Sequence, residues 1–134
     1  MRKVIGGVLL LAALVAVPAV AAAQCDAPGA KVESDRIVVV YRTVPPKIAV
    51  GQHFALLFTV CGSGAPAVPI SVEVDARMPA HGHGMNYRPG ITPLGAGGFR
   101  AEGLMLHMPG HWDLEFVVRE GGRAERVVHR LDLQ

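Results

Sequence analysis

Hydrophobic and polar residues alternate along several short stretches of this 134-residue chain. Over residues 70–78, apolar side chains take every second position, and residues 111–119 repeat the pattern. A period of two with one polar face is typical of half-buried antiparallel strands. Because turn residues separate such stretches, we expect seven strands, over residues 36–42, 53–61, 70–78, 88–94, 98–106, 111–119 and 123–133.

These strands define the expected fold class. No convincing helical period follows residue 23, and Gly121-Gly122 is typical of a tight hairpin between two of the strands. About seven short strands in a chain of this length are typical of a small all-β domain. We therefore predict an immunoglobulin-like antiparallel β-sandwich.

The first 23 residues have the pattern of a secretory signal peptide. Arg2 and Lys3 precede an almost unbroken apolar run, residues 4–20, and three alanines follow it. Cleavage after residue 23 would leave residues 24–134 as a single periplasmic domain with no membrane segment; retention of the run as an anchor is the alternative. Loss of the two basic residues lowers the formal net charge from +2 to 0. Neither nucleic acid nor anionic lipid is therefore an expected partner.

The two cysteines, Cys25 and Cys61, would be exported to a compartment where disulfides persist. A bridge between them would close a loop of about 36 residues, which the chain-entropy model values at roughly 4 kcal/mol. We predict this structural disulfide. The alternatives are a lipid-modified Cys25, which the preceding Gln24 disfavours, and two free cysteines that bind metal.

Histidine and methionine gather in two short segments. Residues 78–85 read Met-Pro-Ala-His-Gly-His-Gly-Met, and residues 107–111 read His-Met-Pro-Gly-His. Imidazole and thioether donors suit soft or borderline metals, copper above all, and neither segment has an Asp or Glu for calcium or magnesium. Imidazoles alone could also hold zinc, which is the second candidate metal. The candidate ligands are His81, His83, Met85, His107, Met108 and His111.

Strand direction predicts where these segments lie. If consecutive strands of the sandwich alternate in direction, every second connection falls at the same end. The two His/Met segments then meet at one end, together with His53, whereas Cys25 and Cys61 meet at the other. The cysteine pairing is an independent argument for the assigned directions. The remaining donors fit packing positions on apolar strand faces: Met78, Met105 and His129.

The order of these motifs resembles a known family. Residues 75–85, 98–104 and 107–112 resemble the YtkA-like and FixH-like group of exported bacterial domains, over roughly residues 36–120. The elements "MPxHxHGM" and "MPGxW" carry the resemblance. It implies a small immunoglobulin-like sandwich associated with copper handling or with the assembly of copper-containing respiratory oxidases. The positions that match are His81, His83, Met85 and Met108.

The leading functional hypothesis is a soluble periplasmic protein that binds copper for delivery, storage or protection. Its partner would be a copper-receiving or oxidase-assembly protein. Membrane-anchored relatives keep a transmembrane helix, whereas the apolar run here looks cleavable, which favours a soluble carrier. The alternative is a metal-independent protein-interaction module that assists assembly of a respiratory or envelope complex. An enzyme is not expected, because the sequence has no nucleophile elbow and no paired carboxylates near the histidines.

Overall fold

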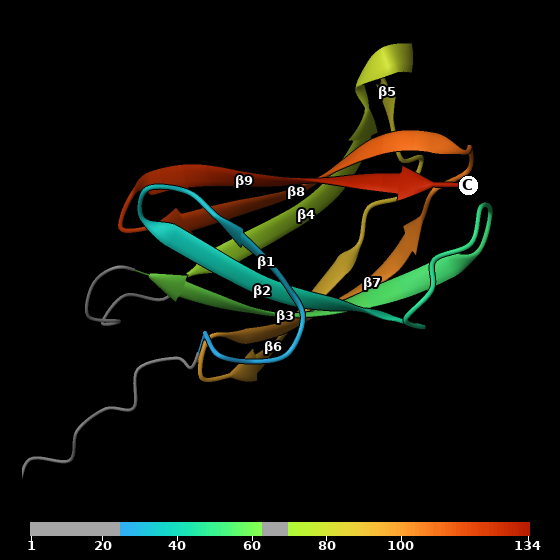
Figure 1. The fold of residues 1–134 in the computed structure, drawn as a ribbon. Coiled ribbons are helices and arrows are strands. Elements are labelled where there is room, and N and C mark those ends of the chain that lie inside the picture. The colour runs from blue at the N-terminus through green and yellow to red at the C-terminus, as the bar shows by residue number, and fades with distance from the viewer. Residues whose placement is uncertain (1–24, 63–69) are drawn as a thin grey trace, which may run out of the picture.

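The chain folds into two antiparallel β-sheets that pack face to face (Figure 1). The computed structural model describes residues 25–62 and 70–134. One sheet has five strands in the order β1-β2-β3-β7-β6, and the other has four in the order β5-β4-β8-β9. The elements are β1 (Ala30–Glu33), β2 (Ile37–Val44), β3 (His53–Gly62), β4 (Ser71–Met78), the short 3₁₀ helix η1 (Pro79–His81), β5 (His83–Gly84), β6 (Gly90–Gly95), β7 (Gly98–Met105), β8 (Gly110–Glu120) and β9 (Arg123–Leu133).

This strand order confirms the predicted sandwich. Strands β2, β3, β7 and β6 form one layer and β4, β8 and β9 the other, which is the division of seven strands in a constant-type immunoglobulin domain. All seven correspond to predicted strands, with ends that shift by a few residues. The structure adds two short edge strands that the sequence pattern did not predict, β1 beside β2 and β5 beside β4.

The core lies between the layers and follows the alternation of the sequence. The inward positions of β4 and β8 are buried, and the positions between them on β4 are exposed. Each fully buried large apolar side chain stabilises the fold by about 1.5–3 kcal/mol. The centre of the core is formed by side chains of both sheets with no measurable exposure: Val39, Leu56, Leu104, Trp112, Leu114 and Phe116.

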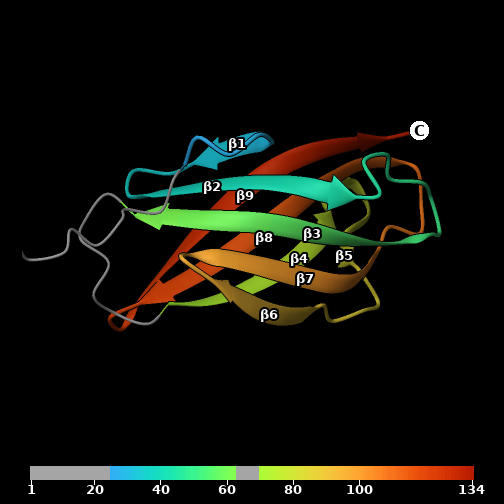
Figure 2. The ribbon, with the colours of Figure 1, turned by 90° about the horizontal axis from the view of Figure 1, so that it is seen from below.

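Different strand ends and turns lie at the two ends of the sandwich, which Figure 2 shows from the side. At one end Val38 of β2 lies opposite Cys61 of β3, and the predicted disulfide joins Cys61 to Cys25 with the Cα atoms 6.2 Å apart. At the other end His53 opens β3 opposite Met105, the last residue of β7. The turns that follow β2, β4 and β7 therefore share this second end, as the alternating strand directions predicted.

The predicted signal peptide, residues 1–23, lies outside the described residues. In the part of the chain that the structure describes, no helix has the length and apolar character needed to cross a membrane.

Candidate functional site

The first His/Met segment forms a tight hairpin at the end of β4. Helix η1 follows Met78 and ends at His81. Its C-cap, Gly82, adopts a left-handed conformation (φ 64°) and donates its N–H to the Met78 carbonyl at 3.0 Å. Glycine takes this conformation without the steric penalty of a side chain. The chain can therefore return as β5, where His83 lies opposite Met78. Met85 follows β5 and donates its N–H to the Ala76 carbonyl of β4 at 3.0 Å.

The second segment spans the turn between β7 and β8. Its backbone is held at both ends, since the Leu106 carbonyl accepts the Gly51 N–H at 2.8 Å and the Met108 carbonyl accepts the Trp112 Nε1–H at 3.0 Å. His107 lies between these two anchored carbonyls, and the side chains of His107 and Met108 are half-buried. The turn is therefore fixed against the core.

The two segments meet, as the strand directions predicted. The ring centroids of His83 and His107 are 5.2 Å apart and their planes are inclined by 29°. His81 continues the row, 5.7 Å from His83, and is exposed. Beneath the row lies the Trp112 indole, 5.4 Å from His107 and 6.0 Å from His83. Four aromatic rings from two distant segments thus form one cluster, which we call the imidazole cluster: His81, His83, His107 and Trp112.

Two nitrogen atoms of the imidazole cluster lack partners. The Nδ1 atoms of His83 and His107 are buried and form no hydrogen bond with the protein. A buried polar atom without a partner costs about 1–3 kcal/mol. Two imidazoles that bind one tetrahedral ion through metal–nitrogen bonds of about 2.0 Å have ring centroids about 5 Å apart. The 5.2 Å between the centroids of these two rings matches that spacing, whereas their stacked arrangement does not by itself direct both Nδ1 atoms at one point.

The two His/Met segments also contain three methionines. Met85 and Met108 are half-buried and pack against the edge of the core. Met78 is fully buried, and its Cε lies 2.8 Å from the point that a Cβ on Gly110 would occupy. Met78, the first residue of the first segment, therefore lies against the second segment as well. Its place at the end of an apolar strand face favoured core packing without excluding a role as a ligand.

Across residues 25–62 and 70–134, no three or more His, Cys, Asp or Glu side chains are grouped so that they could hold a metal ion. The three imidazoles of the cluster are therefore close together without forming such a group.

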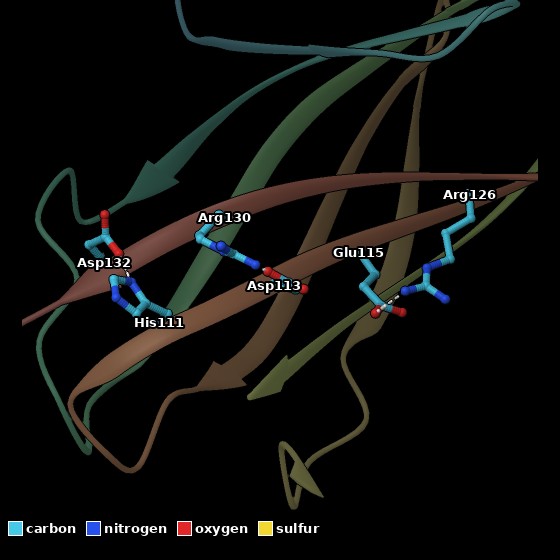
Figure 3. Close-up of polar contacts among 6 residues, drawn as sticks. All are labelled: His111, Asp113, Glu115, Arg126, Arg130 and Asp132. Carbon is cyan, nitrogen blue, oxygen red and sulfur yellow. Dashed lines mark hydrogen bonds and ion pairs between the residues drawn. The ribbon is translucent and has the colours of Figure 1, made fainter. Parts of the chain in front are cut away.

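His111 is not part of the imidazole cluster. It faces outward on β8, where its Nδ1 contacts the Asp132 carboxylate of the neighbouring strand β9 (Figure 3), and its side chain is 69% exposed. The structure thus brings together the imidazoles of His81, His83 and His107 and places His111 on the outer face. Met85 and Met108 lie in the same two segments, packed against the core. Two further ion pairs between β8 and β9 follow His111–Asp132 along the same outer face: Asp113–Arg130 at 3.3 Å and Glu115–Arg126 at 2.7 Å.

The two remaining histidines make local contacts. The His53 ring lies 5.1 Å from Tyr87 at the same end as the cluster. The His129 Nδ1 lies 2.6 Å from the Tyr41 hydroxyl between β9 and β2, and burial raises the pKa of Tyr41 to about 12. Both contacts are those of packing residues.

Comparison of this chain with models of known families, with curated proteins and with solved structures finds no match. The resemblance to YtkA-like and FixH-like domains therefore stays a prediction that rests on the motifs of residues 75–112.

Proposed function

We propose that this protein is a soluble periplasmic metal-binding protein whose cargo is a copper ion. His83 and His107 would be the central ligands, Met85 and Met108 would add thioether sulfur, and His81 would be the outermost imidazole. The observation that carries the proposal is the pair of buried Nδ1 atoms that come from segments more than twenty residues apart and have no hydrogen-bond partner.

Copper(I) suits these donors better than the alternatives. Thioethers are soft ligands that select copper(I), whereas zinc is bound by imidazole, thiolate or carboxylate. Both thiols are joined in the disulfide. Zinc stays the second candidate, because imidazole alone can bind it.

The position of the ligands suits ion transfer by ligand exchange. They lie on two turns at one end of a sandwich whose strands are held by hydrogen bonds and a buried core. A partner could approach the exposed His81 first and replace the inner ligands stepwise without unfolding the domain. Delivery, storage and protection all use such exchange, and a copper-receiving or oxidase-assembly protein would be the partner.

The cellular compartment is proposed from two features. The first 23 residues have the pattern of a secretory signal, and the Cys25–Cys61 disulfide fits an oxidising compartment. In an oxidising compartment a thiolate ligand can be lost by disulfide formation. Imidazole and thioether side chains cannot form disulfides, so they suit a copper(I) site there.

The test is a competition assay on the protein expressed as the full chain and purified after export. Copper(I) is titrated without oxygen against a chromophoric chelator, and zinc is titrated in parallel. We expect one copper(I) per chain. In a His83→Ala/His107→Ala variant the affinity should fall by more than about a hundredfold, because loss of an outer-shell partner alone costs about 10–100-fold.

His111→Ala is the matched control, because it removes an imidazole of the same segment that lies on the outer face. It should leave copper binding unchanged. Full stoichiometry in the double variant would reject these ligands, and absence of copper and zinc binding in the unaltered protein would reject the metal function.

A protein-interaction module is the second candidate. The hairpin of η1 and β5 projects beyond the rest of the sandwich (Figure 1), and Pro79, Ala80 and His81 are exposed at its tip. A partner could recognise this tip without metal. If copper and zinc do not bind, this function becomes the leading one.

A further inference from the structure

A cleft opens along one side of the sandwich, where β1 and β2 of one layer lie beside β9 of the other (Figure 2). Its volume is about 770 Å³, which falls within the range of about 300–1,000 Å³ that is typical of small-molecule pockets. The described residues that line it include no member of the imidazole cluster. The cleft is therefore a second candidate site, separate from the first.

Two aromatic rings line the cleft near the middle of β2 and β9. Tyr41 is only 4% exposed, and its ring centroid lies 5.6 Å from that of His129. The Tyr41 hydroxyl and the His129 Nδ1 lie 2.6 Å apart and satisfy each other. At this end the cleft therefore offers ring surface to a ligand, and the hydrogen-bonding capacity of the Tyr41 hydroxyl is already used.

The lining continues along β9 as an apolar strip. From His129 it passes Leu131 to Leu133, four residue steps that span about 13 Å in an extended strand. Ile48, in the turn that follows β2, lines the cleft as well, and both Leu131 and Ile48 pack against the core. The cleft is thus elongated and apolar, which suits a linear aliphatic chain.

Positive charge lies at the rim of the cleft. Lys47 and Arg42 both line it, are exposed, and form no ion pair with any described residue. The one acidic side chain among the described lining residues is Asp132, whose carboxylate contacts His111 on the outer face of β8 and β9. The charge at the rim therefore favours an anionic group on the ligand.

We infer that this cleft binds a linear aliphatic carboxylate. Its chain would lie along Ile48, Leu131 and the Tyr41 ring, and its carboxylate would lie beside Lys47. Burial of the chain supplies the affinity, because each CH₂ group removed from water contributes. The exposed Lys47 adds a weaker ion pair that selects anions over cations. This site goes beyond the proposed copper function and does not depend on it.

The first test is calorimetric titration of the metal-free protein, expressed as the full chain and purified after export, with three probes. Decanoate should bind at one molecule per chain below the concentration at which it forms micelles. Butanoate should bind more than about a hundredfold more weakly, because it lacks six CH₂ groups. Decyltrimethylammonium has the same chain with the opposite charge and should bind at least about fivefold more weakly.

The second test locates the ligand. Decanoate should shift the backbone amide resonances of residues 41–43 and 129–133 and leave those of the imidazole cluster in place. Lys47→Gln should lower decanoate affinity about two- to fivefold without weakening decyltrimethylammonium. Lys31→Gln is the matched control, because Lys31 is an equally charged and exposed residue on β1 that does not line the cleft. It should leave decanoate affinity unchanged.

Three results would overturn the inference: no binding of decanoate, equal affinity for the anionic and cationic probes, or amide shifts confined to other parts of the fold. Equal effects of Lys47→Gln and Lys31→Gln would reject the placement of the carboxylate. Because none of these measurements uses a metal, their outcome is independent of the copper competition assay.

Discussion

Replacement of Gly110 by alanine tests how the two His/Met segments fit together. Gly110 is the first residue of β8 and adopts φ 123°, a conformation that L side chains rarely take. An alanine Cβ would also lie 2.8 Å from the Cε of Met78. The substitution therefore combines backbone strain with a steric conflict at the floor of the candidate site.

The two effects can be estimated separately. A non-glycine residue in such a region costs about 1–3 kcal/mol. Met78 is fully buried and must leave a preferred rotamer to make room, which costs about 0.5–1.5 kcal/mol. We therefore expect Gly110→Ala to lower the free energy of unfolding by about 1.5–4.5 kcal/mol. A typical domain has a free energy of unfolding of about 5–15 kcal/mol, so the variant should still fold.

Urea unfolding followed by circular dichroism measures the loss. Gly103→Ala is the control for backbone strain, because Gly103 also has a positive φ (85°) but no atom within 4 Å of the added Cβ. A second control, Met78→Leu, removes the Cε and should reduce the effect of Gly110→Ala by about 1 kcal/mol in a double-mutant cycle. Equal losses for the two glycine variants, with no coupling to position 78, would refute the steric part of the reasoning.

Three further predictions concern the remainder of the fold. Replacement of both Cys25 and Cys61 by serine should lower the free energy of unfolding in urea by about 4 kcal/mol, because the 36-residue loop becomes free in the unfolded chain; unchanged stability would contradict this. The hydrogen bond from Ser34 holds the pKa of Glu125 below its usual value, so its stabilisation is present at neutral pH and lost as the pH falls through the folded-state pKa. Glu125→Gln should therefore weaken the acid sensitivity of the unfolding midpoint, and an identical pH profile would contradict the assignment. Burial raises the pKa of Tyr41 from 10.0 to about 12, so stability should fall as the pH rises from about 10 to about 12, and Tyr41→Phe should remove this loss in alkaline unfolding curves.

The strands could be predicted because burial acts on one face of each. On β4 the buried and exposed positions alternate over all eight residues, which is the pattern that the sequence shows directly. The edge strands β1 and β5 could not be predicted in this way. They have four and two residues, which is too short for a period, and they form because the neighbouring strands β2 and β4 offer unpaired backbone groups.

The meeting of the two His/Met segments followed from strand direction, but the roles of single residues did not. His111 is one position before Trp112, and the alternation of β8 places them on opposite faces. The sequence pattern contained this information, because Asp113 and Glu115 share the face of His111. The contact of Trp112 with the imidazoles depends instead on how far the β7–β8 turn bends over the core, which no local pattern specifies.

The unpartnered imidazole nitrogens imply that the candidate site reduces the stability of the metal-free fold. His107 is half-buried with its Nδ1 inaccessible and without a hydrogen bond, and its ring lies 5.4 Å from Trp112. Replacing a buried unsatisfied group by an apolar one of similar size removes its desolvation penalty. We therefore expect His107→Leu to raise the free energy of unfolding of the metal-free protein by about 1 kcal/mol, although the same change should weaken copper binding.

His53→Leu is the control. Because His53 is exposed, this substitution should leave the free energy of unfolding nearly unchanged. Copper(I), if it binds only the folded state, should raise the unfolding temperature of the unaltered protein. The His107→Leu variant should show a smaller rise. A fold that loses stability in His107→Leu without metal would mean that the imidazole is held by interactions that a leucine cannot replace. The nitrogen would then be satisfied in solution, and the central argument for an ion between the two segments would be lost with it.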